Sequence, residues 1–308
     1  MAFTAKDVQS LRERTGCGMM DCKRALTASE GDMEKAIEFL REKGLAAAAK
    51  KSGRIAAEGV VYAVVDEEKN VGVLLEVNSE TDFVAKNDAF KEFVAECAQL
   101  VIDTNPADVD TLLNTVSKDG KNTVAEVLRE KILVIGENMK VRRFVRVEGN
   151  VCTYIHGGGR IGVLVNFDVD NEVAKKVEFK EFAKDIAMQV AASMPTYLAS
   201  ADVPAEVIAK EKEILMAQIA NDPKTANKPE AVIAKMVEGR IGKYYKENCL
   251  VEQPFIKDPD MNVTKFVEAK SKEFGSNITI KEFIRFEKGE GLEKREDNFA
   301  DEVASMIK

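Results

Sequence analysis

The sequence contains a single histidine, His156, and only five scattered cysteines, at positions 17, 22, 97, 152 and 249. A structural zinc site needs about four nitrogen or sulfur ligands held close together, so no metal site is expected. Cys17 and Cys22 are too far apart for a Cys-x-x-Cys redox pair. We therefore predict that all five cysteines are reduced thiols, most of them packing residues, and that the protein needs no cofactor.

Long apolar runs and an excess of basic residues are also missing. No stretch approaches the roughly 20 apolar residues that cross a bilayer, and the N-terminus lacks the apolar core of a signal peptide. Lys and Arg number 45 against 53 Asp and Glu, which gives a formal net charge of −8. Because phosphate binding requires basic side chains in excess, we expect a cytoplasmic protein without a nucleic-acid or membrane partner.

Catalytic motifs are absent as well. The sequence has no Gly-x-Ser-x-Gly elbow, no His-Glu-x-x-His pair and no P-loop. The glycine run Gly157-Gly158-Gly159 follows His156, but it joins two predicted strands, whereas a phosphate cradle opens a helix. From the residues alone, His156 is interpreted as a surface side chain. We therefore expect neither catalytic chemistry nor direct nucleotide binding.

The hydrophobic patterns predict an α+β fold made of several units. The first 45 residues are typical of three short helices, with Thr4 and Asp32 as N-caps and Gly44 as the last stop. So small a module is expected to serve as a docking domain. The predicted divisions are a docking domain (1–45), a linker (46–57), a first core subdomain (58–147), a second core subdomain (148–203), a helical hairpin (204–248) and a C-terminal module that completes the core (249–308).

The two core subdomains are copies of one unit. Residues 58–77 align with residues 148–167 at a constant offset of 90, and Val84-Ala85-Lys86 then matches Val173-Ala174-Lys175 after a one-residue deletion. Each copy has the pattern of two strands joined by a hairpin loop and followed by a helix. Between the copies, residues 109–133 are predicted to be helical and residues 139–147 to form a strand. The basic cluster on that strand (Lys140, Arg142, Arg143 and Arg146) is interpreted as a solvated face beside acidic neighbours.

Residues 204–248 predict two helices separated by a loop bounded by prolines. In this interpretation, three apolar side chains of the first helix face three of the second: Ile208, Leu215 and Ile219 against Ile233, Val237 and Ile241. Beyond the hairpin we expect a helix at 263–274, a strand at 278–287 and a final helix at 298–307.

Phe83 stands out because the repeat allows it to be compared with a second copy. Asp82 and Phe83 occupy an apparent turn, and the second copy has Asn171 and Glu172 there. A position that tolerates a charge in one copy is expected to face solvent in both. Core packing is the usual role of a phenylalanine, but the repeat favours an exposed interface anchor.

Met19 and Met20 open the second predicted helix of the docking domain. Successive helical residues point about 100° apart, so both cannot face the core of a small bundle. One methionine is expected to be exposed, which suits an adaptable binding surface. Packing of both remains the alternative if the linker covers one of them.

Five segments together identify a family. The sequence resembles bacterial translation elongation factor Ts over essentially its whole length, and the segments that carry the resemblance are residues 11–23, 81–86, 135–138, 156–157 and 283–286. The resemblance implies a ubiquitin-associated-like three-helix domain, two related α+β subdomains, a protruding helical hairpin and a C-terminal module.

The resemblance also implies a function and a set of site residues. It indicates a guanine nucleotide exchange factor for elongation factor Tu, the GTPase of translation elongation in protein biosynthesis. Phe83 is expected to act as an apolar wedge and to matter more than Asp82, which would disturb the Mg²⁺ network of the partner. The residues implied in Mg²⁺ dislocation are Thr81, Asp82, Phe83 and Val84. The residues implied in partner binding are Arg12, Met19, Met20, Lys23, Ile135, Gly136, His156, Met236 and Val237.

Two other functions fit the residues less well. One is an interaction scaffold with a ubiquitin-associated-like module and no exchange activity. The other is an α+β hydrolase or transferase, which lacks any recognisable pair of nucleophile and base.

Overall fold

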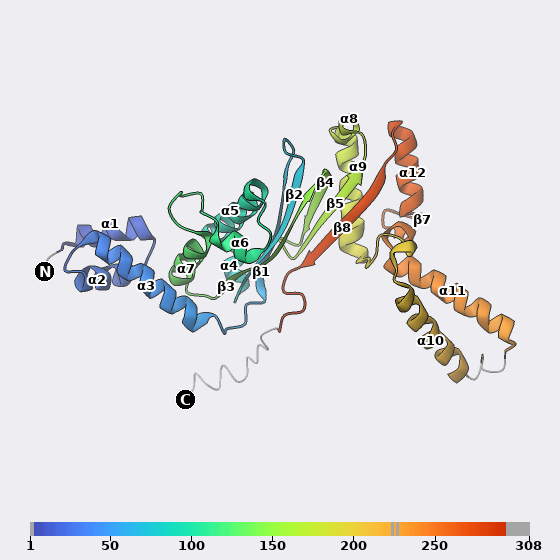
Figure 1. Cartoon of the computed structure of the whole chain (residues 1–308), viewed down its shortest axis with the longest axis horizontal. Coiled ribbons are helices and arrows are strands. Elements are labelled where there is room, and N and C mark those ends of the chain that lie inside the picture. The colour runs from blue at the N-terminus through green and yellow to red at the C-terminus, as the bar shows by residue number, and fades with distance from the viewer. Residues whose placement is uncertain (1–2, 223–224, 226–227, 294–308) are drawn as a thin grey trace.

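The computed structural model describes residues 3–222, 225 and 228–293 (Figure 1). The helix expected at 298–307 lies outside the described residues. The α-helices are α1 (Ala5–Thr15), α2 (Met19–Ala28), α3 (Met33–Lys51), α4 (Asp82–Lys86), α5 (Asp88–Thr104), α6 (Val109–Asn114), α7 (Val124–Ile135), α8 (Asn171–Ala174), α9 (Val177–Ser193), α10 (Ala205–Asn221), α11 (Glu230–Asn248) and α12 (Val263–Phe274). The strands are β1 (Glu58–Asp66), β2 (Val71–Ser79), β3 (Met139–Glu148), β4 (Asn150–His156), β5 (Ile161–Asp168), β6 (Pro254–Phe255), β7 (Asp258–Asn262) and β8 (Thr279–Glu287).

Helices α1 to α3 form the predicted three-helix module. Thr4 caps α1 in a reciprocal capping box with Asp7, and Asp32 caps α3, as the sequence predicts. The expected stop at Gly44 is wrong, because α3 continues to Lys51. Gly44 lies instead on the helix face that packs against α7, where a Cβ would stand 3.7 Å from the backbone oxygen of Arg129, an ordinary van der Waals contact. The packing of α3 against α7 therefore does not require a glycine at this point.

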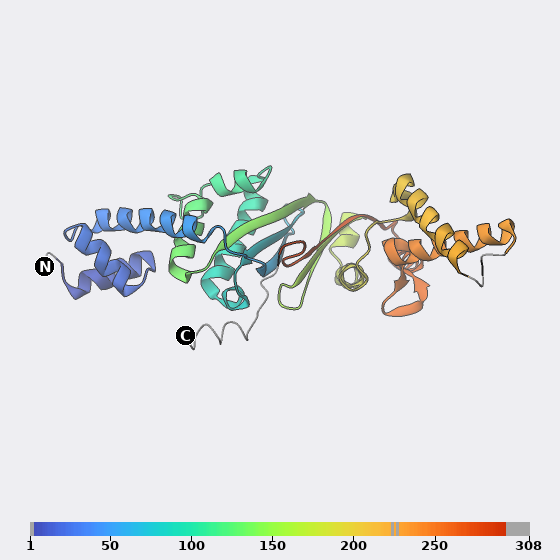
Figure 2. The ribbon, with the colours of Figure 1, turned by 90° about the horizontal axis from the view of Figure 1, so that it is seen from below.

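Each repeat supplies two strands of a three-stranded antiparallel sheet. The first sheet has the order β1-β2-β3 and the second has the order β4-β5-β8, so the C-terminal strand completes the second copy. The outer faces of the two sheets are covered by the corresponding helices, α5 and α9 (Figures 1 and 2). The inner faces pack against each other through Val61, Leu74, Leu164 and Phe286. Strand β2 is buried along its whole length because it is covered on both faces.

The basic cluster on β3 is only in part a solvated face. Lys140 is exposed, as predicted, but Arg142, Arg143 and Arg146 are half-buried. Arg142 and Arg143 both bind the carboxylate of Glu76, which is fully buried in β2. The prediction of acidic neighbours is correct, but the exposure expected for these arginines is wrong, because the segment after β8 also lies against them.

The region before β3 also differs from expectation in one respect. The predicted continuous helix over 109–133 is two helices, α6 and α7, and the intervening chain pairs Val116 with Thr123 in an isolated antiparallel bridge. A reciprocal capping box between Thr123 and Glu126 begins α7. This local capping favours a new helix start over continuation of the first helix.

Helices α10 and α11 form the predicted antiparallel hairpin, and the six apolar residues expected to face one another pack together. The hairpin lies at one end of the elongated molecule and the three-helix module at the other (Figures 1 and 2). Across the described part of the chain, no helix is both long and apolar enough to span a lipid bilayer. All five cysteines are free thiols and four of them are buried, as predicted.

Candidate functional site

Phe83 lies in the first turn of the short helix α4. This helix follows β2, and Thr81 is its N-cap residue. Its side chain is 76% exposed, the largest exposure of any large hydrophobic side chain among the described residues. The next residue, Val84, is buried against the core of the first repeat and anchors the helix. The expected turn is therefore a short helix, and the predicted exposure of Phe83 is confirmed.

Asp82 stands beside Phe83 and is also exposed. Its carboxylate accepts a 2.8 Å hydrogen bond from Lys86, one turn further along α4. This hydrogen bond lowers the pKa of Asp82, so the side chain is a carboxylate at neutral pH. The Lys86 ammonium also lies 5.6 Å from the centre of the Phe83 ring. The exposed tip of α4 thus combines an apolar ring with a full negative charge.

The second repeat provides an internal comparison for this tip. Helix α8 occupies the place of α4, and Glu172 is exposed there as Phe83 is in the first repeat. Glu172 pairs with Lys175 at 2.8 Å, as Asp82 pairs with Lys86. The fold therefore accepts a charged side chain at the position of Phe83, so the aromatic ring is not required for packing.

The segment after α7 lies against the start of α4. Gly136 ends α7 in the left-handed conformation (φ 89°), and Ile135 is half-buried against the first core. The carboxylate of Glu137 accepts hydrogen bonds from the backbone N–H of Thr81 (2.9 Å) and from its hydroxyl (2.7 Å). The structure thus brings the Thr81–Val84 segment and the Ile135–Gly136 segment together. The sequence predicts no role for Glu137, although this residue belongs to the segment 135–138, one of the segments that carry the family resemblance.

The candidate residues of the three-helix module form a separate exposed surface. Met19 and Met20 are 46% and 62% exposed. Both methionines are therefore exposed, whereas the sequence predicts exposure of one. Arg12 and Lys23 are exposed on the same module. Gly18 precedes α2 in an extended conformation, and both methionines lie in the exposed first turn of that helix.

His156 lies at the end of β4, where the glycine run turns the chain into β5. Its ring is exposed, and Nδ1 lies 3.1 Å from the hydroxyl of Tyr154. The glycines connect two strands, as predicted, so they do not form a phosphate cradle at a helix N-terminus. All three have positive φ angles, which glycine adopts without strain.

Met236 and Val237 lie in α11 of the helical hairpin. Met236 is half-buried, and Val237 is buried between the two helices. Met236 and Val237 therefore lie outside the Phe83 tip, and so do His156 and the three-helix module. The structure brings together only two of the predicted segments, those around Phe83 and Ile135.

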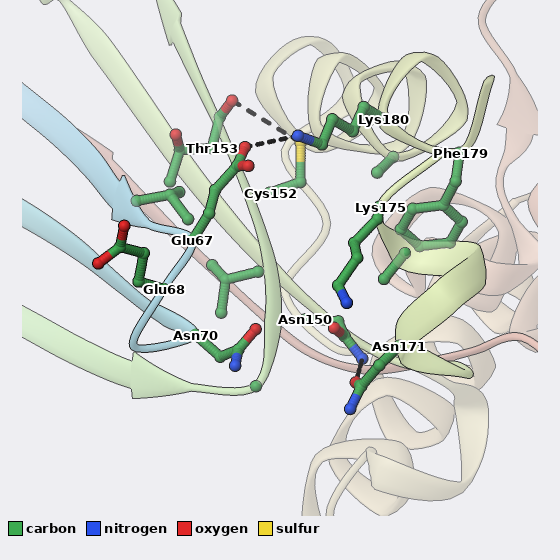
Figure 3. A pocket seen from close by; sticks show the side chains of 15 residues that line it. Glu67, Glu68, Asn70, Asn150, Cys152, Thr153, Asn171, Lys175, Phe179 and Lys180 are labelled. Carbon is green, nitrogen blue, oxygen red and sulfur yellow. Dashed lines mark hydrogen bonds and ion pairs between the residues drawn. The ribbon is translucent and has the colours of Figure 1, made fainter. Parts of the chain in front are cut away.

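A groove of about 580 Å³ opens at the opposite end of the first sheet, and sequence reasoning did not anticipate it (Figure 3). It lies between the β1–β2 loop, the start of β4 and helices α8 and α9, and an ion pair of 2.6 Å between Glu67 and Lys180 spans it. The length of β2, about 27 Å from Val71 to Ser79 at roughly 3.4 Å per residue, separates it from the end of the sheet at which Thr81 lies. Within the described ranges, no cluster of three or more His, Cys, Asp or Glu side chains could hold a metal ion.

Comparison with known proteins places this architecture among translation factors. Residues 80–290 match the family described as Elongation factor TS. Elongation factor Ts of Clostridium perfringens strain 13 is 55% identical over 307 residues, which cover 99% of both chains. Elongation factor Ts of Clostridium botulinum strain Alaska E43 is 52% identical over 308 residues, with 99% of both chains covered. That of Clostridium novyi strain NT is also 52% identical, over 99% of this chain and 98% of its own.

Proposed function

Because the chain belongs to the elongation factor Ts family, we propose that it releases GDP from elongation factor Tu by disturbing the Mg²⁺ and phosphate site of that GTPase. Members of this family partner elongation factor Tu and promote its nucleotide exchange during translation elongation. They perform no covalent chemistry of their own. Release of GDP allows the GTPase to be reloaded with GTP.

The observation that carries this proposal is the exposure of Phe83 at the tip of α4. A single exposed apolar side chain on a protein surface is ordinary, but here the equivalent position of the second repeat is a glutamate. The ring is held on a short helix that Val84 anchors to the core, so it projects from a rigid support. In the proposal, the ring enters an apolar crevice of the partner as a wedge.

Asp82 contributes through its charge. Mg²⁺ bridges the nucleotide phosphates to the GTPase and offsets their negative charge. A carboxylate brought close to the groups that hold the ion competes for them and weakens their hold on the metal. Loss of Mg²⁺ then removes much of the attraction that retains GDP.

The energetics require more contacts than the wedge alone. Binding of the factor and of GDP must weaken each other by the same ratio, because coupling between two sites is reciprocal. Burying one phenyl ring contributes only about 1.5–3 kcal/mol, or roughly a factor of 10 to 100 in affinity. The remaining binding energy must come from surfaces that keep contact while the nucleotide leaves.

We assign that role to the candidate residues outside α4. The docking domain, residues 1–45, is proposed to contact the nucleotide-binding domain of the partner through Arg12, Met19, Met20 and Lys23, and Ile135 and Gly136 add contacts beside the wedge. His156 is proposed to contact another partner domain. On the helical hairpin, half-buried Met236 would make the contact and Val237 would support it from within.

Release of labelled GDP from elongation factor Tu tests the proposal. The parent protein is expected to accelerate release greatly, and Phe83→Ala is expected to lower the second-order rate constant of stimulated release by about 10- to 100-fold, from the apolar burial that is lost. Val177→Ala is the matched control, because Val177 is a 68% exposed apolar residue of the second repeat. It should release GDP at the parental rate.

A parent protein without effect on release would rule out the exchange role. An active parent with an equally active Phe83→Ala variant would rule out the wedge while leaving the exchange role in place.

A further inference from the structure

Two carboxylates form hydrogen bonds that join the segment before α4 to the segment after α7. Glu137 accepts two hydrogen bonds from Thr81, as described above. In the opposite direction, Glu80 accepts a 2.6 Å hydrogen bond from the backbone N–H of Asn138. Each segment therefore supplies one carboxylate, which accepts a hydrogen bond from a backbone N–H of the other segment. All of these contacts are partly buried. The contacts join residues that are more than 50 positions apart in the sequence.

The second repeat shows what this arrangement replaces. Asp170 occupies the place of Thr81, and its own side chain accepts a hydrogen bond from the N–H of Glu172, so α8 is capped from within. The hydroxyl of Thr81 accepts no such bond from α4, and it donates to Glu137. The N-cap residue of the helix that carries Phe83 is thus held by a contact from a distant segment, whereas the N-cap residue of α8 bonds to its own helix.

We propose that Glu137 is a positioning residue for nucleotide exchange, which holds the Phe83 tip at a fixed place relative to Ile135 and Gly136. This inference rests on the function proposed above and deepens it. Glu137 directly follows Gly136, so one carboxylate sets the spacing between two contact segments. Order established before binding does not have to be established in the complex, which favours association. Glu137 is not expected to touch the nucleotide or the metal.

The motion of the tip can be measured in the free protein. The chain contains no tryptophan, so Phe83→Trp introduces a single fluorophore at the tip. Adding Glu137→Gln replaces a carboxylate that accepts two hydrogen bonds with an amide that can accept only one of them. We expect the fast component of the fluorescence anisotropy decay to grow in amplitude. An unchanged decay would overturn the inference without bearing on the exchange role.

The kinetic test uses as control a glutamate that also bonds to a threonine but lies away from the tip. Glu126 accepts hydrogen bonds from the N–H and hydroxyl of Thr123 at the other end of α7, both on one carboxylate oxygen, whereas Glu137 uses one oxygen for each donor of Thr81. Glu137→Gln is expected to lower stimulated GDP release by about tenfold, which corresponds to the loss of one charge-assisted hydrogen bond. Glu126→Gln should leave both the release rate and the anisotropy decay at the parental values.

A double variant that combines Glu137→Gln with Phe83→Leu shows whether Glu137 acts through the aromatic ring. Leucine keeps an apolar side chain at position 83 but removes the ring. We expect Glu137→Gln to lower release by clearly less than tenfold in that background. An equal tenfold loss in both backgrounds would mean that Glu137 acts independently of the ring, and would overturn the inference.

Thr81→Val gives a second route if Glu137→Gln does not fold. It removes only the hydroxyl that donates to Glu137 and should reproduce the anisotropy change; an unchanged decay would again overturn the inference. A parent protein that does not stimulate release would overturn the proposed function together with this inference. An active parent with fully active Glu137→Gln and Thr81→Val variants would overturn the inference alone.

Discussion

The backbone N–H of Gly289 donates a 2.8 Å hydrogen bond to the buried carboxylate of Glu76, and so joins the C-terminal segment to the first sheet. Asn78, Arg142 and Arg143 complete the surroundings of that carboxylate. Because Gly289 follows β8 of the second sheet, these bonds connect the two repeats across the interface between them. Glu76 is therefore a structural link as well as a buried charge.

Glu76→Ala is expected to destabilise the protein by about 3–5 kcal/mol, because it leaves two arginines without their buried partner. The free energy of unfolding in urea measures this loss. Glu67→Ala is the control, since Glu67 forms an exposed pair with Lys180 that should contribute no more than about 1 kcal/mol. Similar small losses for both variants would contradict a linking role for Glu76.

The same carboxylate should make stability depend on pH. Burial raises the pKa of Glu76, but the hydrogen bonds from Gly289, Asn78 and the two arginines outweigh it and lower the pKa from its ordinary value of 4.5. A folded-state pKa below the unfolded value means that the stabilisation is present above about pH 4.5 and is lost as the pH falls through the folded-state pKa. Urea midpoints between pH 7 and pH 3 should decrease toward acid. Glu76→Gln should flatten part of that decrease, and an unchanged slope would contradict the assignment.

The contact between the two sheets depends on glycines at equivalent positions of the repeat. Gly72 and Gly162 are 90 positions apart and both face the opposite sheet. A Cβ at Gly162 would overlap Val61 and stand 2.7 Å from Leu74. We expect Gly162→Ala to cost about 1–3 kcal/mol from overpacking.

A second substitution tests the origin of that loss. Val61→Ala removes the methyl groups that a Cβ at Gly162 would overlap. The double variant Gly162→Ala/Val61→Ala should therefore be more stable than the sum of the single effects implies. Simple additivity in thermal or urea unfolding would place the cost elsewhere than in this contact.

Phe83→Glu copies the residue of the second repeat into the first. Because the equivalent position accepts Glu172 in the same fold, the free energy of unfolding should change by no more than about 0.5 kcal/mol. Stimulated GDP release should nevertheless fall at least as far as in Phe83→Ala. The reverse exchange, Glu172→Phe, should fold and leave release unchanged. Strong destabilisation by Phe83→Glu would show that the ring has a packing role.

Local sequence signals predicted much of the fold correctly. The capping pair of Thr4 and Asp7, the hairpins of the repeat and the hydrophobic seam of α10 and α11 depend on residues that are close in sequence or periodic within one element. The prediction that Gly44 ends α3 was wrong, because the helix continues to Lys51 and packs at Gly44 against α7, more than 80 residues away in sequence.

The sequence likewise predicted one part of the candidate site and not the other. The exposure of Phe83 followed from comparison with Glu172, since both positions are read from one repeated pattern. The role of Glu137 did not, because its hydrogen bonds reach Thr81 across the chain and no local pattern encodes them.

The sequence by itself determined most of the elements, their duplication and the family, because propensity, periodicity and motif identity are properties of neighbouring residues. Only the tertiary structure decided which arginines of β3 are half-buried, how Glu76 ties the two repeats together and which carboxylate bonds to Thr81 beside the Phe83 tip. These outcomes depend on hydrogen bonds and burial between segments that meet only when the two sheets pack.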